Sequence, residues 1–181
     1  MSLVSQTQPR RAGFARWFAL SIFIVAVVVG AAMGPYWTVV ADVAGRSRLH
    51  APDWSLLAGL SLPIKIHLAT ALAALVLGAV LMVVRKGRTF HRLAGWTWVS
   101  LVSVTAGATL FITSLNHGSW SLLHLLTGWV LIGLPLAVIA ARRHAIRQHR
   151  RQMMGLFYGG FAINVFIALL PGRALWMTFF G

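Results

Sequence analysis

Long stretches without a formally charged residue alternate with short basic connections along this chain of 181 residues. With histidine counted as neutral, no charge occurs in 17–41, 66–84, 93–141 or 152–172. A helix that crosses a bilayer needs roughly 20 apolar residues, so the third stretch is long enough for two such helices. The pattern predicts an all-α polytopic membrane protein with about five transmembrane helices, four of which form a histidine-bearing core.

The boundaries of the predicted elements follow from polar and helix-breaking residues. We expect a cytoplasmic tail over 1–16 and a single transmembrane domain over 17–181, with its core at about 64–170. The first charge-free run is too long for a typical signal peptide, which favours a retained membrane anchor. Helices are predicted at about 17–40, 64–84, 91–114, 120–141 and 150–170, with a bend at Pro135 and a short interfacial helix over 54–62 capped by Asp53.

Basic residues are concentrated on one side of the predicted membrane. The tail, the turn at 85–92 and the loop at 142–151 contain 12 Lys and Arg together, whereas the opposite side contains 4. Because cytoplasmic loops carry the excess of basic residues, we expect the amino terminus in the cytoplasm and the carboxyl terminus outside. This pattern indicates a multi-pass protein of the bacterial inner membrane. Anionic lipid headgroups suit the basic charge, so nucleic acid is not needed as a partner.

The composition excludes several kinds of chemistry. The chain has no cysteine and no glutamate, and its two acidic residues are Asp42 and Asp53. Disulfides, iron–sulfur clusters and thiolate metal sites are therefore excluded, and hydrolysis by paired carboxylates is implausible. The seven histidines are the remaining residues that could carry chemistry.

Four histidines stand near the beginnings of four successive predicted helices. Because successive helices alternate in direction, His67 and His124 are expected near the outer face, and His91 and His149 near the cytoplasmic face. This arrangement gives two pairs at matched depths, each contributed by alternate helices. The other three histidines, His50, His117 and His144, fall in connections, where we expect them to face solvent. Of these, His117 is the candidate for an additional ligand.

Two imidazoles that face each other can hold a haem iron from both sides. Each offers one ring nitrogen and donates the other N–H to a neighbouring group. The flat macrocycle also needs space beside each ligand, and the motif H-x-x-x-G-W supplies a small residue at two places. It begins at His91 and at His124, and places Gly95 and Gly128 one helical turn beyond them.

The two remaining histidines differ in the residues that share their helix faces. Small residues share the helix face of His67, namely Ala71, Ala74 and Gly78. One turn beyond His149 stands Met153, where a gap is wanted, and the inner pair also lies at the edge of its apolar runs. We therefore expect the outer pair, His67 and His124, to be the stronger haem site.

Anionic haem propionates pair well with arginine and lysine side chains. On the outer face the candidates are Lys65 and Arg173, which stand on the side where topology disfavours basic residues. On the inner face the candidates include Arg92 and Arg150. The alternative for Arg92 and Arg150 is that they only set the orientation of the protein in the membrane, with their charged groups extended to the membrane surface.

Two resemblances add to this interpretation. Part of the chain resembles a bacterial family of predicted membrane proteins of unknown function. The resemblance rests on His67, on the segment H-R-L-A-G at 91–95 and on the segment H-R-R-Q-M at 149–153. The histidine layout is also similar to that of the cytochrome b-561 family, transmembrane electron carriers with two bis-His haems. That resemblance implies the same pairing of outer with outer and inner with inner histidines.

The leading hypothesis is a membrane electron-transfer protein that carries one or two b-type haems. A quinone or another membrane component would be its redox partner, and the chain would act alone, as a homo-oligomer or within a larger membrane complex. The alternative is a non-redox membrane protein, such as a small transporter or an accessory subunit, whose His and Arg residues bind an anion or lipid or only pack. A third hypothesis is a zinc or copper site made of histidine alone.

Overall fold

The computed structural model describes residues 23, 27, 30, 34, 37–112 and 122–180. The chain divides into two compact units, Met1–Arg46 and Ser47–Gly181. Regular structure in the described residues is helical, as predicted. The separate tail over 1–16 and the single domain over 17–181 stay predictions.

In the first unit, the helix α2 (Trp37–Arg46) is described. The predicted helix over 17–40 lies largely outside the described residues. The connection that we expected from residue 41 onward is instead helical as far as Arg46. Asp42 and Arg46 form a 2.8 Å ion pair one turn apart, an arrangement that stabilises an exposed helix end.

Three long apolar helices follow in the second unit: α4 (Leu62–Val83), α5 (Thr89–Leu110) and α6 (Leu122–Arg142). Each is long and apolar enough to cross a membrane, which fits the predicted helical membrane protein. Pro63 lies in the first turn of α4, where its missing N–H leaves no hydrogen bond unmade. Gly87, at φ 82°, forms the turn into α5. The helix α6 runs through Pro135 without ending there.

The last long element differs from the helix predicted over 150–170. The chain becomes helical earlier, as α7 (Ile146–Gly155), widens into the π-helical segment η3 (Leu156–Ala162), and continues as α8 (Ile163–Ala168). His144, at φ 57°, closes a tight turn after α6, so α7 begins sooner than the charge pattern suggests. The adjacent Gly159 and Gly160 have low α-helix propensity, which favours a local departure from α-helical winding.

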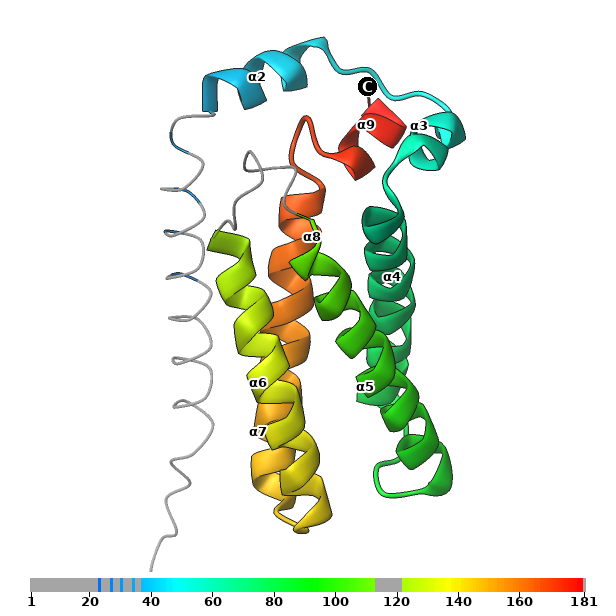
Figure 1. The fold of residues 1–181 in the computed structure, drawn as a ribbon, viewed down its shortest axis with the longest axis vertical. Coiled ribbons are helices and arrows are strands. Elements are labelled where there is room, and N and C mark those ends of the chain that lie inside the picture. Colours follow the sequence, from blue (N-terminus) through cyan, green and yellow to red (C-terminus); the bar gives the residue numbers. More distant parts are fainter. Residues whose placement is uncertain are drawn as a thin grey trace, which may run out of the picture. The chain divides into compact units, whose positions relative to one another are not determined.

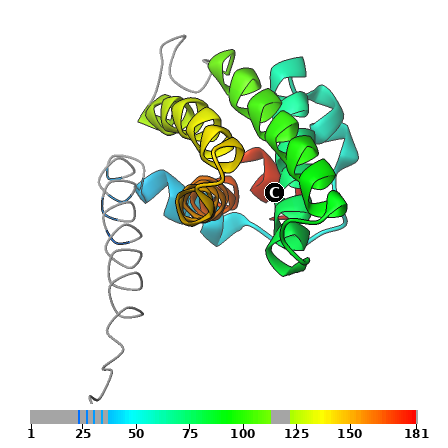
Figure 2. The same ribbon diagram turned by 90° about the horizontal axis from the view of Figure 1, so that it is seen from below.

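These helices form a four-membered bundle. The helix α4 packs against α5 and η3, and α6 packs against α5, α7 and η3. The order around the bundle is therefore α4, α5, α6 and the α7–η3–α8 helix, so that α4 stands opposite α6 and α5 opposite α7 (Figure 1, Figure 2). This is the alternation that the proposed pairing of histidines requires.

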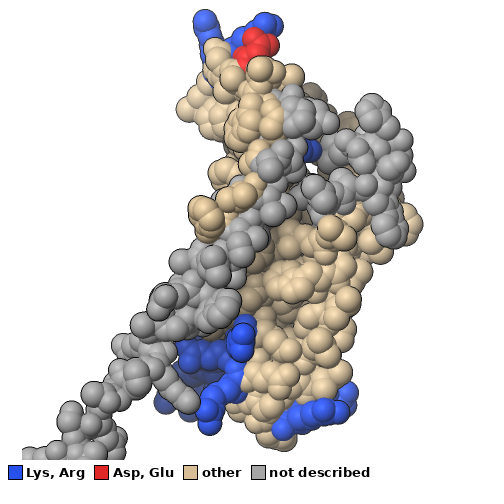
Figure 3. Space-filling view, turned by 90° about the vertical axis from the view of Figure 1, so that its left-hand side faces the viewer, with Lys and Arg blue, Asp and Glu red and all other residues tan. Residues whose placement is uncertain are grey.

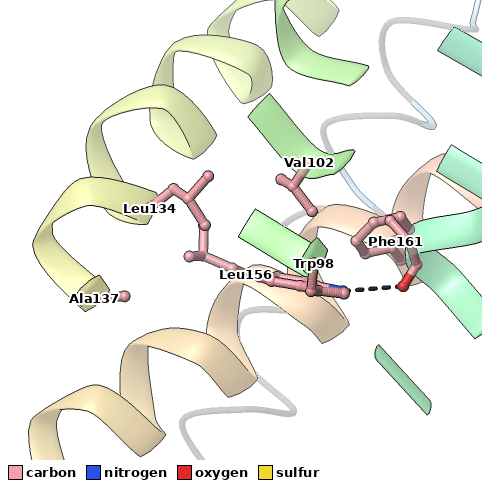
Figure 4. Close-up of a cluster of buried hydrophobic side chains, with 7 residues drawn as sticks. Trp98, Val102, Leu134, Ala137, Leu156 and Phe161 are labelled. Carbon is pink, nitrogen blue, oxygen red and sulfur yellow. Dashed lines mark hydrogen bonds between the residues drawn. The ribbon is translucent and has the colours of Figure 1, made fainter. Parts of the chain in front are cut away.

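The core of the bundle is a cluster of buried side chains from all four members. Trp98 at its centre donates its indole N–H to the carbonyl oxygen of Ala74, 2.9 Å away (Figure 4). At Gly78 a Cβ would come within 2.7 Å of the Trp98 indole nitrogen and closer still to the ring of Phe157. A glycine is therefore required for α4 to approach both aromatic rings. The buried members of the cluster are Ala74, Trp98, Val102, Leu134, Ala137, Leu156 and Phe161.

Two short helices cap the end of the bundle at which α4 begins (Figure 1). The helix α3 (Trp54–Gly59) is capped by Asp53, whose carboxylate accepts from the amides of Ser55 and Leu56, as predicted. The aromatic segment that follows Arg173 forms the helix α9 (Ala174–Phe180). Backbone N–H groups of the segment before α3 satisfy carbonyl groups at the end of α9: His50 donates to Phe179 and Asp53 to Thr178, each at 3.0 Å.

Candidate functional site

The outer histidine pair lies on opposite members of the bundle. His67 is in the second turn of α4, and His124 is in the first turn of α6. Both helices begin at the same end of the bundle, so the two histidines share one depth (Figure 1). His124 is 9% exposed and its Nε2 atom is buried.

His67 is held against α5 by polar atoms of that helix. Its Nδ1 atom lies 3.2 Å from the carbonyl oxygen of Thr105 and 2.9 Å from the hydroxyl oxygen of Thr109. A carbonyl oxygen can only accept, so Nδ1 carries the ring proton. The lone pair of the neutral imidazole is then on Nε2.

The inner histidine pair lies on the other two members of the bundle. His91 is in the first turn of α5, and His149 is in the first turn of α7. His91 and His149 interact electrostatically, so both lie at the same end of the bundle. The Nδ1 atom of His149 lies 2.9 Å from the carbonyl oxygen of Ala137 on α6. As at His67, this contact leaves the lone pair on Nε2.

Two polar atoms at the inner end are buried without a hydrogen-bond partner among the described residues. They are Nδ1 of His91 and Oε1 of Gln152, which is one turn beyond His149 on α7. Buried polar groups are almost always hydrogen-bonded, so these two atoms are available to a further polar partner. Without a hydrogen bond at Nδ1, His91 is less firmly oriented than His67.

The small residues near the histidines fall into two groups, those with open surroundings and those packed against other helices. The second group corrects the expectation of free space beside His67. A Cβ at Gly95 or Gly128 would meet nothing within 4 Å, as at Gly107, so no side chain fills the surroundings of these two glycines. The face of α4 beyond His67 is instead filled, because Ala74 is fully buried and Gly78 faces aromatic rings of other helices. That face was expected to leave room for a macrocycle, and it serves helix packing.

The candidate propionate partners differ in exposure. Lys65, Arg92 and Arg150 are exposed, whereas Arg173 is half-buried just before α9. Asp53 is the single acidic residue of the unit Ser47–Gly181, so these cations lack carboxylate neighbours that could neutralise them. In Figure 3, one group of basic side chains lies at the lower end of the bundle, below a flank that shows no charge, and others lie at the top of the view beside an acidic residue.

The tertiary structure also reveals functional candidates that the sequence did not single out. Thr105 and Thr109 contact His67, and the carbonyl oxygen of Ala137 contacts His149. The two threonines could have been noticed as an i, i+4 polar pair near the outer end of an apolar helix. No sequence signal points to a main-chain carbonyl.

No group of three or more His or Asp side chains that could hold a metal ion occurs in the described part of the chain. The additional candidate ligand His117 lies outside the described residues. Comparisons with protein-family models, with curated proteins and with solved structures found no match to this chain.

Proposed function

We propose that this chain is a membrane electron-transfer protein that carries one or two b-type haems. His67 and His124 are the ligands of the outer haem, and His91 and His149 are those of the inner haem. The observation that carries the proposal is the orientation of two imidazoles, one in each pair. His67 and His149 both place Nδ1 on a carbonyl oxygen of a neighbouring helix. Histidines that bind metal are held in this way, with Nε2 left for the metal.

The residues beside the ligands fit a flat, mostly apolar group. Open space lies beside Gly95 and Gly128, one turn beyond a histidine of each pair. The Nε2 atom of His124 is buried within the bundle. The outer pair therefore has an oriented ligand, a buried ligand and adjacent space, and it is the stronger of the two sites.

When bound, haem supplies reversible one-electron chemistry at its iron. The chain contributes the ligands, their orientation and exclusion of water. Lys65 and Arg173 would pair with propionates at the outer end, and Arg92 and Arg150 at the inner end. Burial and charge pairing of this kind are the means by which a protein sets a reduction potential.

The same proposal includes the membrane topology. The α7–η3–α8 helix and the segment over 17–40 would join the three long apolar helices to give five spans. The amino terminus would lie in the cytoplasm of a bacterial cell, with the basic end of the bundle against anionic lipid headgroups. A quinone or another membrane component would exchange electrons with the haems. A reporter fused after Gly181 should be active outside the cytoplasm, and cytoplasmic activity would contradict the five spans.

Absorption spectroscopy tests the cofactor directly. Protein purified from a haem-competent host should show a Soret band and a sharp α-band on reduction. Colourless protein would overturn the proposal, provided that a known haem protein made in the same host is fully loaded.

Single substitutions test the ligands. His67→Ala or His124→Ala should lose more haem per protein than His91→Ala or His149→Ala, at an unchanged size-exclusion profile. His144→Asn is the matched control, because His144 is exposed in a turn whose positive φ asparagine accepts. Loss of haem from the inner variants alone would reverse the ranking of the two sites.

A further inference from the structure

Three half-buried threonines connect α4 to α5 beside His67. The hydroxyls of Thr70 on α4 and Thr105 on α5 are 2.7 Å apart. Thr109, one turn beyond Thr105, contacts His67 at 2.9 Å. The three side chains therefore surround the histidine within a segment that is otherwise apolar.

The contacts of Nδ1 favour one tautomer of His67. The Thr109 hydroxyl lies 2.9 Å from the carbonyl oxygen of Thr105, to which it donates its proton, and its oxygen then accepts from Nδ1–H of His67. With the proton on Nε2, the Thr109 hydroxyl would donate to Nδ1 instead, and the lone pair of Nδ1 would face the carbonyl oxygen of Thr105 at 3.2 Å. The contact with the Thr105 carbonyl is therefore favourable in the Nδ1–H tautomer and unfavourable in the other.

The hydroxyl of Thr105 secures the helix that supplies these acceptors. It lies 2.7 Å from the Thr70 hydroxyl, and the two share one hydrogen bond. One of them donates across the helices, while the other donates within its own helix, Thr105 to the carbonyl oxygen of Leu101 at 2.8 Å or Thr70 to that of Ile66 at 2.7 Å. Ile66 and Thr70 flank His67 on α4. The contact therefore fixes α4 against α5 at the depth of the histidine, which holds the distance between the ring and its acceptors.

We propose that Thr109 is a positioning residue for His67, and that it acts together with the carbonyl group of Thr105. The two acceptors hold the ring as the Nδ1–H tautomer and direct Nε2 toward its ligand. The tautomer part of this inference stands on the contacts alone, and the ligand part rests on the proposed haem function. A hydrogen bond from Nδ1–H raises the basicity of Nε2, so Thr109 would strengthen iron binding and favour the oxidised iron.

The tautomer is measured without haem, by ¹⁵N NMR of the haem-free protein in lipid bilayers with labelled histidine rings. The His67 signals are those that disappear in His67→Gln. We expect the Nδ1–H tautomer in the wild type and in Thr109→Ser, and a mixture of tautomers in Thr109→Val. An Nε2–H tautomer in the wild type would overturn the inference, whatever the variants do.

The second measurement is haem binding. Thr109→Val should bind haem about 10- to 100-fold more weakly and show a higher midpoint potential, while Thr109→Ser should restore both values. Thr97→Val is the matched control, since Thr97 is on the same helix and contacts the carbonyl oxygen of Leu93 in its own helix. Equal affinity and potential in Thr109→Val and the wild type would overturn the positioning role. If the wild type binds no haem, the proposed function fails, and the tautomer measurement still decides the role of Thr109.

Discussion

The indole nitrogen of Trp98 donates a hydrogen bond to the carbonyl oxygen of Ala74 on the neighbouring helix, 2.9 Å away. Trp98 is 4% exposed and Ala74 is fully buried, so this bond forms away from water and lipid. It joins α5 to α4 midway between the outer and inner histidines. The contact therefore holds α4 against α5 between the two candidate sites.

We expect Trp98→Phe to lower the free energy of unfolding by about 1–3 kcal/mol. The change removes an interhelical hydrogen bond, worth about 0.6–2 kcal/mol in a membrane bundle, and leaves a cavity where the larger ring was. Thermal unfolding in detergent measures the effect. Trp96→Phe is the control because Trp96 is 56% exposed, and an equal loss in that variant would contradict the role of the buried bond.

Gly78→Ala should also destabilise the bundle, by about 1–3 kcal/mol. Its new Cβ would meet the rings of Phe157 and Trp98 at distances that force one of them to move. Gly107→Ala on α5 is the matched control, since a Cβ there would meet nothing within 4 Å. The control should be neutral or slightly more stable, because alanine favours helix over glycine by about 1 kcal/mol. If both variants unfold at the same temperature, the close approach at Gly78 is not required.

Leucine at the open glycines separates folding from haem binding. Gly128→Leu and Gly95→Leu should leave the unfolding temperature nearly unchanged, since a Cβ at either position meets open space. Each should lower haem content, because the side chain would occupy the space beside His124 or His91. Gly107→Leu has comparable open space and no ligand histidine one turn away. The ratio of Soret to protein absorbance measures the effect, and full haem content in the first two variants would show that the macrocycle does not use this space.

The cap of α3 should weaken in acid. The pKa of Asp53 is lowered from its ordinary value of 3.8, first by the hydrogen bond from the Ser55 hydroxyl and then by that from the Leu56 amide. A lowered pKa in the folded state means that the carboxylate stabilises the cap fully above pH 3.8 and loses this effect as the pH falls through the lowered value. Amide proton shifts of Ser55 and Leu56 should follow that titration. Asp53→Asn retains a capping oxygen without a titrating group, and a pH dependence that persists in it would contradict the assignment.

The sequence determined the helical elements because their signals are local. A long run without charge must satisfy its backbone groups internally, which only a helix can do within one segment of a bilayer. The three long helices could be predicted for this reason. Asp53 could be predicted as the cap of α3 because capping depends on one side chain at the helix end. The alternation of helix direction also placed the four histidines at two ends of the bundle. The π-helical segment was missed because Gly159 and Gly160 permit a departure from α-helical winding without specifying it, and its contacts with α4 and α6 cannot be read from its own sequence.

What only the tertiary structure decided is which small residues pack and which leave space. Gly78 and Gly128 are equivalent in the sequence, each lying beyond a histidine on one helix face. Aromatic rings from two other helices fill the surroundings of Gly78, while nothing lies near a Cβ at Gly128. The orientation of His67 likewise depends on Thr105 and Thr109, which are 38 and 42 residues away along the chain. Contacts of this kind form between helices, and the periodicity of one helix carries no information about the side chains that its neighbour presents.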